Sequence, residues 1–132
     1  MSEMKVQFTG VKKLFPHGGI LHKRYLRAVN GVSFGIREGE ILAVVGESGC
    51  GKTTLARMLM KLHPITEGSI RVDGQELSEI REKRAIREFH SKIQMIFQDP
   101  FASLNPAHEV GDIVARAVTL HNPSLSGERL RA

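Results

Sequence analysis

The sequence predicts an α/β fold, and three observations lead to that prediction. A continuous apolar run at residues 41–45 is followed at once by a glycine-rich loop, residues 46–51. Residues 52–62 then carry apolar side chains at the spacing of an amphipathic helix. A second apolar run, residues 93–97, ends at Asp99-Pro100. Short apolar runs bounded by turn residues are typical of strands buried on both faces of a parallel sheet.

The residues before the first apolar run predict extended structure. Residues 5–8 alternate in polarity and predict a short strand. Residues 28–36 predict a second extended segment, although Asn30-Gly31 within it is a pair typical of a hairpin turn. Gly18-Gly19 marks a loop between them.

Downstream of the first helix, the pattern alternates between hairpin and helix. Residues 68–77 predict a β-hairpin whose turn is Asp73-Gly74. Residues 79–90 are highly charged and predict an exposed helix, for which a solvated face is favoured over a docking face. Helical spacing returns at residues 110–120, and the chain from Asn122 onward is polar.

Composition narrows the class of protein. The 132 residues are 41% hydrophobic, enough for a packed core, and carry a formal net charge of +5. Basic charge alone could indicate nucleic acid, but six Phe, one Tyr and no Trp form no aromatic-basic stripe, so no nucleic-acid partner is expected. The single cysteine, Cys50, excludes an internal disulfide. No apolar run approaches the roughly 20 residues that span a bilayer, and the N-terminus lacks the apolar core of a signal peptide.

The glycine-rich loop fits the pattern G-x-x-x-x-G-K-[ST], which binds phosphates. Its glycines allow the backbone to curl so that several N–H groups point at one anion. The following helix adds the N–H groups of its first turn and the positive end of its dipole. The predicted ATP-binding residues of this motif are Gly46, Glu47, Ser48, Gly49, Cys50, Gly51, Lys52, Thr53 and Thr54.

Individual positions of the motif have different tasks. Lys52 supplies a positive charge for the β- and γ-phosphates, and the Thr53 hydroxyl is a candidate ligand of Mg²⁺. The alternative is a glycine-rich turn with an ordinary surface lysine, which the flanking strand and helix patterns disfavour. Cys50 could be a redox-sensitive thiol, but a small residue that fits the loop is the preferred interpretation.

Two stretches together carry a family resemblance. Residues 39–55 resemble the Walker A region of ABC-transporter ATPases, with the Gly-Glu-Ser-Gly-Cys-Gly-Lys wording of peptide and nickel importers. Residues 93–106, Ile-Gln-Met-Ile-Phe-Gln-Asp-Pro-Phe-Ala-Ser-Leu-Asn-Pro, resemble the Q-loop of the same subfamily. The resemblance implies a P-loop NTPase with a RecA-like core and an N-terminal antiparallel β-subdomain, truncated in the helical subdomain.

The resemblance also implies a domain organisation. The expected parts are a β-subdomain at 1–40 and 65–78, a RecA-like core at 41–64 and 79–99, and the start of the helical subdomain at 100–132.

Further site residues follow from the resemblance. It assigns Gln98 to contact with Mg²⁺ and the attacking water, a catalytic role shared with Lys52. It also implies an aromatic ring that stacks on adenine, for which Tyr25 is preferred over Phe15 because Tyr25 directly precedes the second strand and has a polar tip.

The function implied is that of an energy-coupling ATP-binding subunit of an importer for peptides, nickel or similar small solutes. Its expected partners are transmembrane permease subunits, a second ATP-binding subunit in a homo- or heterodimer and, indirectly, a substrate-binding protein. Its expected location is the cytoplasmic face of the membrane, as a peripheral protein. The alternatives are an ABC ATPase without a transport role, and a small P-loop kinase or switch protein.

Some parts of an ABC ATPase are not found in the sequence. There is no apolar run ending in Asp-Glu and no later switch histidine, and residues 125–129, Leu-Ser-Gly-Glu-Arg, only imitate the start of the Leu-Ser-Gly-Gly-Gln motif. The full-length protein is therefore expected to be an ATPase, and this chain alone to bind ATP without efficient hydrolysis. Because the buried strands lack neighbours, poor solubility is also expected.

Overall fold

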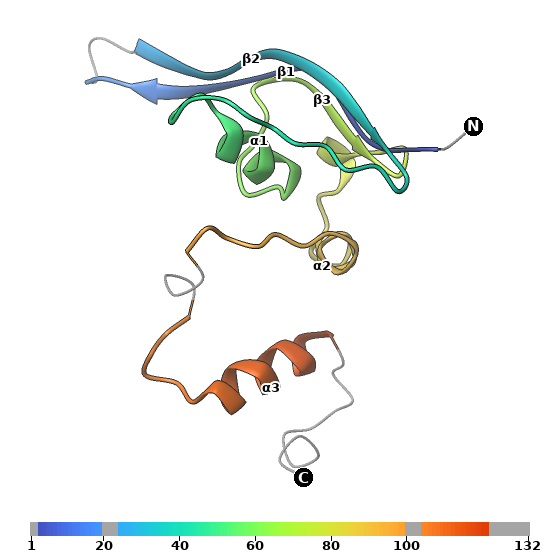
Figure 1. The fold of residues 1–132 in the computed structure, drawn as a ribbon, viewed down its shortest axis with the longest axis vertical. Coiled ribbons are helices and arrows are strands. Elements are labelled where there is room, and N and C mark those ends of the chain that lie inside the picture. Colours follow the sequence, from blue (N-terminus) through green and yellow to red (C-terminus); the bar gives the residue numbers. More distant parts are fainter. Residues whose placement is uncertain (1–2, 20–23, 100–103, 122–132) are drawn as a thin grey trace. The chain divides into compact units, whose positions relative to one another are not determined.

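The structure is a computed structural model, which describes residues 3–19, 24–99 and 104–121. The chain divides into two compact units, Met1–Ile93 and Gln94–Ala132. Among the described residues, the first unit contains a sheet with two α-helices, and the second contains one (Figure 1).

The first unit contains a four-stranded antiparallel sheet. Its strands are β1 (Met4–His17), β2 (Arg24–Arg37), β3 (Glu67–Val72) and β4 (Gln75–Glu76). They lie in the order β2-β1-β3-β4, so β1 is paired on both edges (Figure 1). The expected N-terminal antiparallel β-subdomain is confirmed, and its first two strands are longer than the sequence pattern indicated.

Bulges in the pairing of β1 with β2 allow the predicted extended segment 28–36 to continue through Asn30-Gly31. Asn30-Gly31 does not form a hairpin turn; both residues lie within β2, where Gly31 has a φ of 69°. The register changes from Val11↔Val32 to Lys13↔Val29, which leaves one extra residue on β2. A glycine in the left-handed region at a bulge uses the same conformational freedom that a turn would use.

The hairpin predicted at residues 68–77 is confirmed. Asp73 and Gly74 connect β3 to β4 with φ of 49° and 76°, both in the left-handed region that a two-residue hairpin turn requires. Where β3 begins, a Cβ added to Gly68 would lie 2.4 Å from the carbonyl oxygen of Gly10. Glycine is therefore needed for β3 to approach β1 at this point.

Three α-helices and one 3₁₀ turn complete the described residues. They are α1 (Lys52–Leu59), η1 (Leu77–Glu79), α2 (Lys83–Lys92) and α3 (Val110–His121). Helix α1 ends before the expected Leu62 because Lys61 takes a left-handed φ of 55° and the N–H groups of Leu62 and His63 both donate to the Arg57 carbonyl.

The core of the first unit lies between one face of the sheet, α1 and the segment that leads into α2. Phe8 stacks on Phe34 at 4.4 Å between ring centroids. The buried apolar residues are Phe8, Val11, Val29, Met58, Ile70, Leu77, Ile80 and Phe89. Met58 fixes α1 against the sheet, and Phe89, with the partly buried Ala85 and Ile86, anchors α2.

The two apolar runs predicted as buried strands are not strands here. The side chains of Ile41, Val45 and Ile96 are 96%, 87% and 94% exposed. A strand buried on both faces needs a hydrogen-bonded neighbour on each edge. No strand among the described residues pairs with 41–45 or 93–97. Of the second run, Ile93 packs against the core of the first unit.

None of the helices in residues 3–19, 24–99 and 104–121 has the length and apolar character needed to cross a bilayer.

Candidate nucleotide-binding site

The predicted phosphate-binding loop lies between the extended segment 41–45 and α1. Residues 46–50 are solvent-exposed, so their backbone groups are accessible to a ligand. Gly49 and Gly51 have φ of 80° and 98°, values that side chains rarely adopt. A turn from Glu47 to Cys50, with the Cys50 N–H donating to the Glu47 carbonyl at 3.3 Å, gives the loop its curl.

The Lys52 side chain folds back over this loop. Its ammonium donates to the carbonyl oxygens of Gly46 at 2.7 Å and Glu47 at 2.6 Å, and lies 3.4 Å from the Cys50 sulfur. These contacts hold one full positive charge at the mouth of the loop. An ammonium with exchangeable carbonyl partners can move to phosphate oxygens, which form stronger, charge-assisted hydrogen bonds.

The start of α1 adds donors beside the ammonium. Gly51 is the N-cap, with no side-chain cap, and the first helical hydrogen bond is donated by Leu55 to the Gly51 carbonyl at 3.0 Å. The N–H groups of Lys52, Thr53 and Thr54 therefore have no partner within the helix. The first turn contains no acidic residue that would compete with an anion. Thr53 is exposed there, so its hydroxyl is available to a metal ion.

Close packing fixes the loop against the sheet. A Cβ added to Gly51 would lie 2.2 Å from the carbonyl oxygen of Ala28 and 3.4 Å from the Val29 side chain. Only glycine allows the end of the loop to approach β2 this closely. The direction of α1 is consequently set by β2.

The register of the sheet distinguishes the two aromatic candidates. Lys13 pairs with Val29 and Leu14 pairs with Arg27, so Ala28 is a bulge residue. After the bulge, Phe15 is opposite Leu26 and Pro16 is opposite Tyr25. Because opposite residues share a face and neighbours alternate, Tyr25 lies on the face of the sheet opposite to Phe15.

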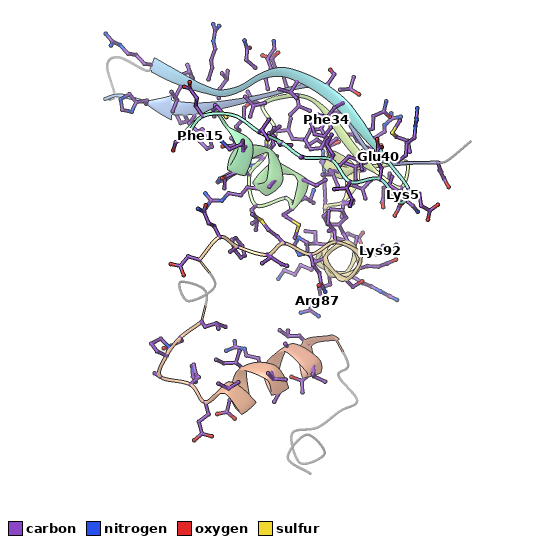
Figure 2. All side chains as sticks on the ribbon, viewed as in Figure 1. Lys5, Phe15, Phe34, Glu40, Arg87 and Lys92 are labelled. Carbon is purple, nitrogen blue, oxygen red and sulfur yellow. The ribbon has the colours of Figure 1, made fainter. Side chains whose placement is uncertain are left out.

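Contacts show which of these faces carries α1. The Phe15 ring meets the His63 ring, which follows α1, edge to face at 5.4 Å between centroids. Figure 2 shows Phe15 on the same side of the sheet as α1. Tyr25 is 59% exposed. Phe15 therefore lies on the face of the sheet that carries α1, and which of the two rings stacks on adenine stays a prediction.

Gln98, the remaining predicted site residue, belongs to the second unit and is exposed. Its role stays a prediction. The imitation motif at residues 125–129 lies outside the described residues.

Two residues beside the site were missed by sequence reasoning. Lys13 is only 7% exposed, and its ammonium lies 4.9 Å from the centroid of the Phe15 ring. His63 supplies the edge contact to the same ring. The signal for Lys13 was the alternation Val11, Lys13, Phe15, which places a lysine at an inward position of the strand. No sequence signal indicates His63.

Comparison with known proteins identifies the family. The sequence model of the family described as "ABC transporter" matches residues 29–128. The oligopeptide transport ATP-binding protein AppF of Bacillus subtilis is 41% identical over 130 residues, which cover 96% of this chain and 40% of that protein. The oligopeptide transport ATP-binding protein OppF of Escherichia coli is 47% identical over 108 residues, covering 80% and 31%. This chain spans less than half the length of these relatives.

Solved structures share the fold. The ATP-binding cassette MJ0796, in a dimeric post-hydrolysis state bound to ADP and Pi, matches with a TM-score of 0.77 at 25% identity, over 96% of this chain and 52% of that one. The cbiO1 protein of Clostridium perfringens matches with a TM-score of 0.67 at 22% identity, over 98% of this chain and 47% of that one. Because the family match extends from β2 to beyond α3, this chain belongs to the ABC transporter family.

Proposed function

We propose that this chain binds ATP as part of the energy-coupling subunit of an importer for peptides or similar small solutes. The observation that carries the proposal is the Lys52 ammonium, held 2.6–2.7 Å from two loop carbonyls beside the uncapped start of α1. A full charge, the helix dipole and unpaired N–H groups converge there, which is what a triphosphate requires.

Different residues bind the phosphates and the metal ion. Lys52 neutralises the β- and γ-phosphates, and the backbone from Gly46 to Thr54 encloses them. Among the described residues, no group of three or more His, Cys, Asp or Glu could hold a metal ion. The Thr53 hydroxyl and the phosphate oxygens would hold a Mg²⁺ ion, because Mg²⁺ prefers oxygen ligands. The family resemblance implies Gln98 as a further ligand. When bound, Mg²⁺ would neutralise charge on the phosphates.

The adenine ring is assigned to Phe15. This ring lies on the α1 side of the sheet, whereas the register places Tyr25 on the other side. Stacking on an aromatic face gives affinity for the base without a specific hydrogen bond.

Hydrolysis is proposed for the full-length protein. Phosphoryl transfer depends on a positioned water, a metal ion and charge stabilisation from several groups at once. Lys52 and Gln98 are the candidates for catalysis within this chain. We expect this chain alone to bind ATP with little turnover.

The partners follow from the relatives. AppF and OppF are named as oligopeptide transport proteins, which favours a transport role over a non-transport ATPase or a small kinase. The matching MJ0796 structure is dimeric. We infer that the full-length protein pairs with a second ATP-binding subunit and with permease subunits at the cytoplasmic face of the membrane.

A domain organisation is proposed on the same basis. It consists of a β-subdomain at 1–40 and 65–78, a RecA-like core at 41–64 and 79–99, and the start of a helical subdomain from residue 100 onward.

Calorimetric titration with Mg·ATP tests the phosphate site. Lys52→Ala should weaken binding roughly 30-fold or more, because a charge-assisted contact to the phosphates is lost. Arg57→Ala removes a cation of equal charge from the last turn of α1 and serves as the control. Equal affinities of the wild-type chain and Lys52→Ala would reject the proposed site.

A further inference from the structure

The Phe15 ring is held by two neighbours of different chemistry. The Lys13 ammonium lies over the ring, 4.9 Å from its centroid. The His63 ring also contacts it, with 5.4 Å between centroids and an interplanar angle of 82°. Phe15 itself is half-buried, so part of its surface remains open to solvent.

Lys13 is placed by contacts that leave its ammonium little freedom. It is buried, and its ammonium donates to the Pro64 carbonyl at 2.7 Å. No carboxylate of residues 3–19, 24–99 or 104–121 forms an ion pair with it. A buried charge needs compensation, and here a carbonyl dipole and the negative face of an aromatic ring provide it.

Both contacts come from one short segment of chain. His63 touches the Phe15 ring directly, and Pro64 holds the lysine that lies over the ring. The His63 N–H donates to the carbonyl of Arg57 in α1 at 3.2 Å. The ring on β1 is therefore tied to the helix whose other end begins at the phosphate loop.

We propose that Lys13 and His63 are positioning residues that hold the Phe15 ring for stacking on the adenine base of a bound nucleotide. The proposal rests on the proposed function, in which Phe15 contacts the base. Phe15 is half-buried, so the base would stack on the part of the ring that stays exposed. The cation also withdraws π density from the ring, which strengthens its stacking on an electron-rich purine.

The proposal separates affinity for the base from affinity for the phosphates. Inorganic tripolyphosphate carries the charge of the ATP tail and has no base. Calorimetric titration of the chain with ATP and with tripolyphosphate thus measures the two contributions independently. A residue that only supports the fold would change both affinities together.

Lys13→Met and His63→Ala should each weaken ATP binding roughly threefold to tenfold and change tripolyphosphate affinity less than twofold. Phe15→Ala should act in the same direction with a larger effect. His63→Phe retains an aromatic edge against the ring, so it should keep ATP affinity within about twofold of the wild-type chain.

Different failures point to different errors. Unchanged ATP affinity in Lys13→Met and His63→Ala, with Phe15→Ala impaired, would overturn the positioning role and leave the proposed function intact. A parallel loss of ATP and tripolyphosphate affinity would show a structural role and also overturn it. Unchanged ATP affinity in Phe15→Ala would remove the basis of the inference. Insensitivity to Lys52→Ala would instead reject the proposed phosphate site itself.

Discussion

The α-carbon of Gly51 faces the carbonyl oxygen of Ala28 so closely that a methyl group placed on it would lie 2.2 Å from that oxygen. This contact joins the last residue of the phosphate loop to a bulge in β2. The position of the loop is therefore a property of the antiparallel sheet as well as of the loop's own sequence.

Replacing Gly51 should destabilise the fold much more than replacing Gly49. Gly51→Ala combines a left-handed backbone with the clash at Ala28, and we expect it to destabilise the fold by about 3 kcal/mol. Gly49→Ala has a similar φ and nothing within 4 Å of the added Cβ, so about 1 kcal/mol is expected. Denaturant unfolding of both variants measures the difference. Equal losses would contradict the packing described for Gly51.

The Thr53 hydroxyl should matter only when magnesium is present. Thr53→Val keeps the shape of the side chain and removes the candidate metal ligand, so Mg·ATP affinity should fall roughly tenfold. Titrations with Mg²⁺ and with excess EDTA measure the two conditions, and the variant should match the wild-type chain in EDTA. Thr9→Val, at an exposed threonine of β1 outside the site, is the matched control. An equal effect of Thr53→Val in both conditions would exclude the metal-ligand role.

Titration of Lys61 should make the free energy of unfolding depend on pH in the alkaline range. Burial, with a smaller contribution from the Arg81 charge, lowers the pKa of Lys61 below its ordinary 10.5. Between the lowered pKa and 10.5 the unfolded chain binds more protons than the folded chain, so stability rises with pH in that window. Relative to Lys61→Met, the wild-type chain should thus become more stable as the pH approaches 10.5.

The variant pair isolates this titration from others. Hydrogen bonding and ion pairing with Asp73 raise the pKa of Lys5. This raised pKa stabilises the folded state below pH 10.5, and the stabilisation is lost as the pH rises above that value. Lys5 is present in both proteins, so its effect cancels in the comparison. Urea unfolding at several pH values measures the difference. A difference that stays constant or falls with pH would contradict the burial of the Lys61 ammonium.

The exposed apolar runs should drive self-association of the chain. Exposed, unpaired apolar segments are sites of aggregation, and a charge placed within them opposes it. Ile96→Lys, at a side chain 94% exposed, should reduce light scattering severalfold at equal concentration. Gln94→Lys adds the same charge nearby without removing an apolar group, and should help less. Equal scattering by wild type and Ile96→Lys would contradict an aggregation role for this run.

Local signals predicted the parts of the fold that depend on local physics. Asp73-Gly74 forms the predicted hairpin turn because both residues tolerate a left-handed backbone, and Lys52 begins the predicted helix directly after the glycine loop. Asn30-Gly31 carries an equally strong turn signal, yet pairing of β2 with β1 absorbs it as a bulge. A local preference gave way there to contacts formed at a distance in the sequence.

The remaining site features depend on contacts that no local pattern records. The bulge at Ala28 reverses the alternation of side chains along β2 and so places Tyr25 on the opposite face from Phe15. Lys13 is buried because its ammonium reaches Pro64, 51 residues further along the chain. The runs at 41–45 and 93–97 have the composition of buried strands, but composition alone cannot supply the neighbours that would pair with them.

The position of β1 between β2 and β3 links nucleotide binding in the loop to the stability of the sheet. The phosphate loop and α1 form the connection from β2 to β3, and both of those strands pair with β1. The loop is therefore connected at both ends to strands that pair with β1. A nucleotide bound in the loop restricts this connection and so opposes separation of the sheet. Slower amide hydrogen exchange along β1 would then report nucleotide binding in a loop that β1 does not itself contain.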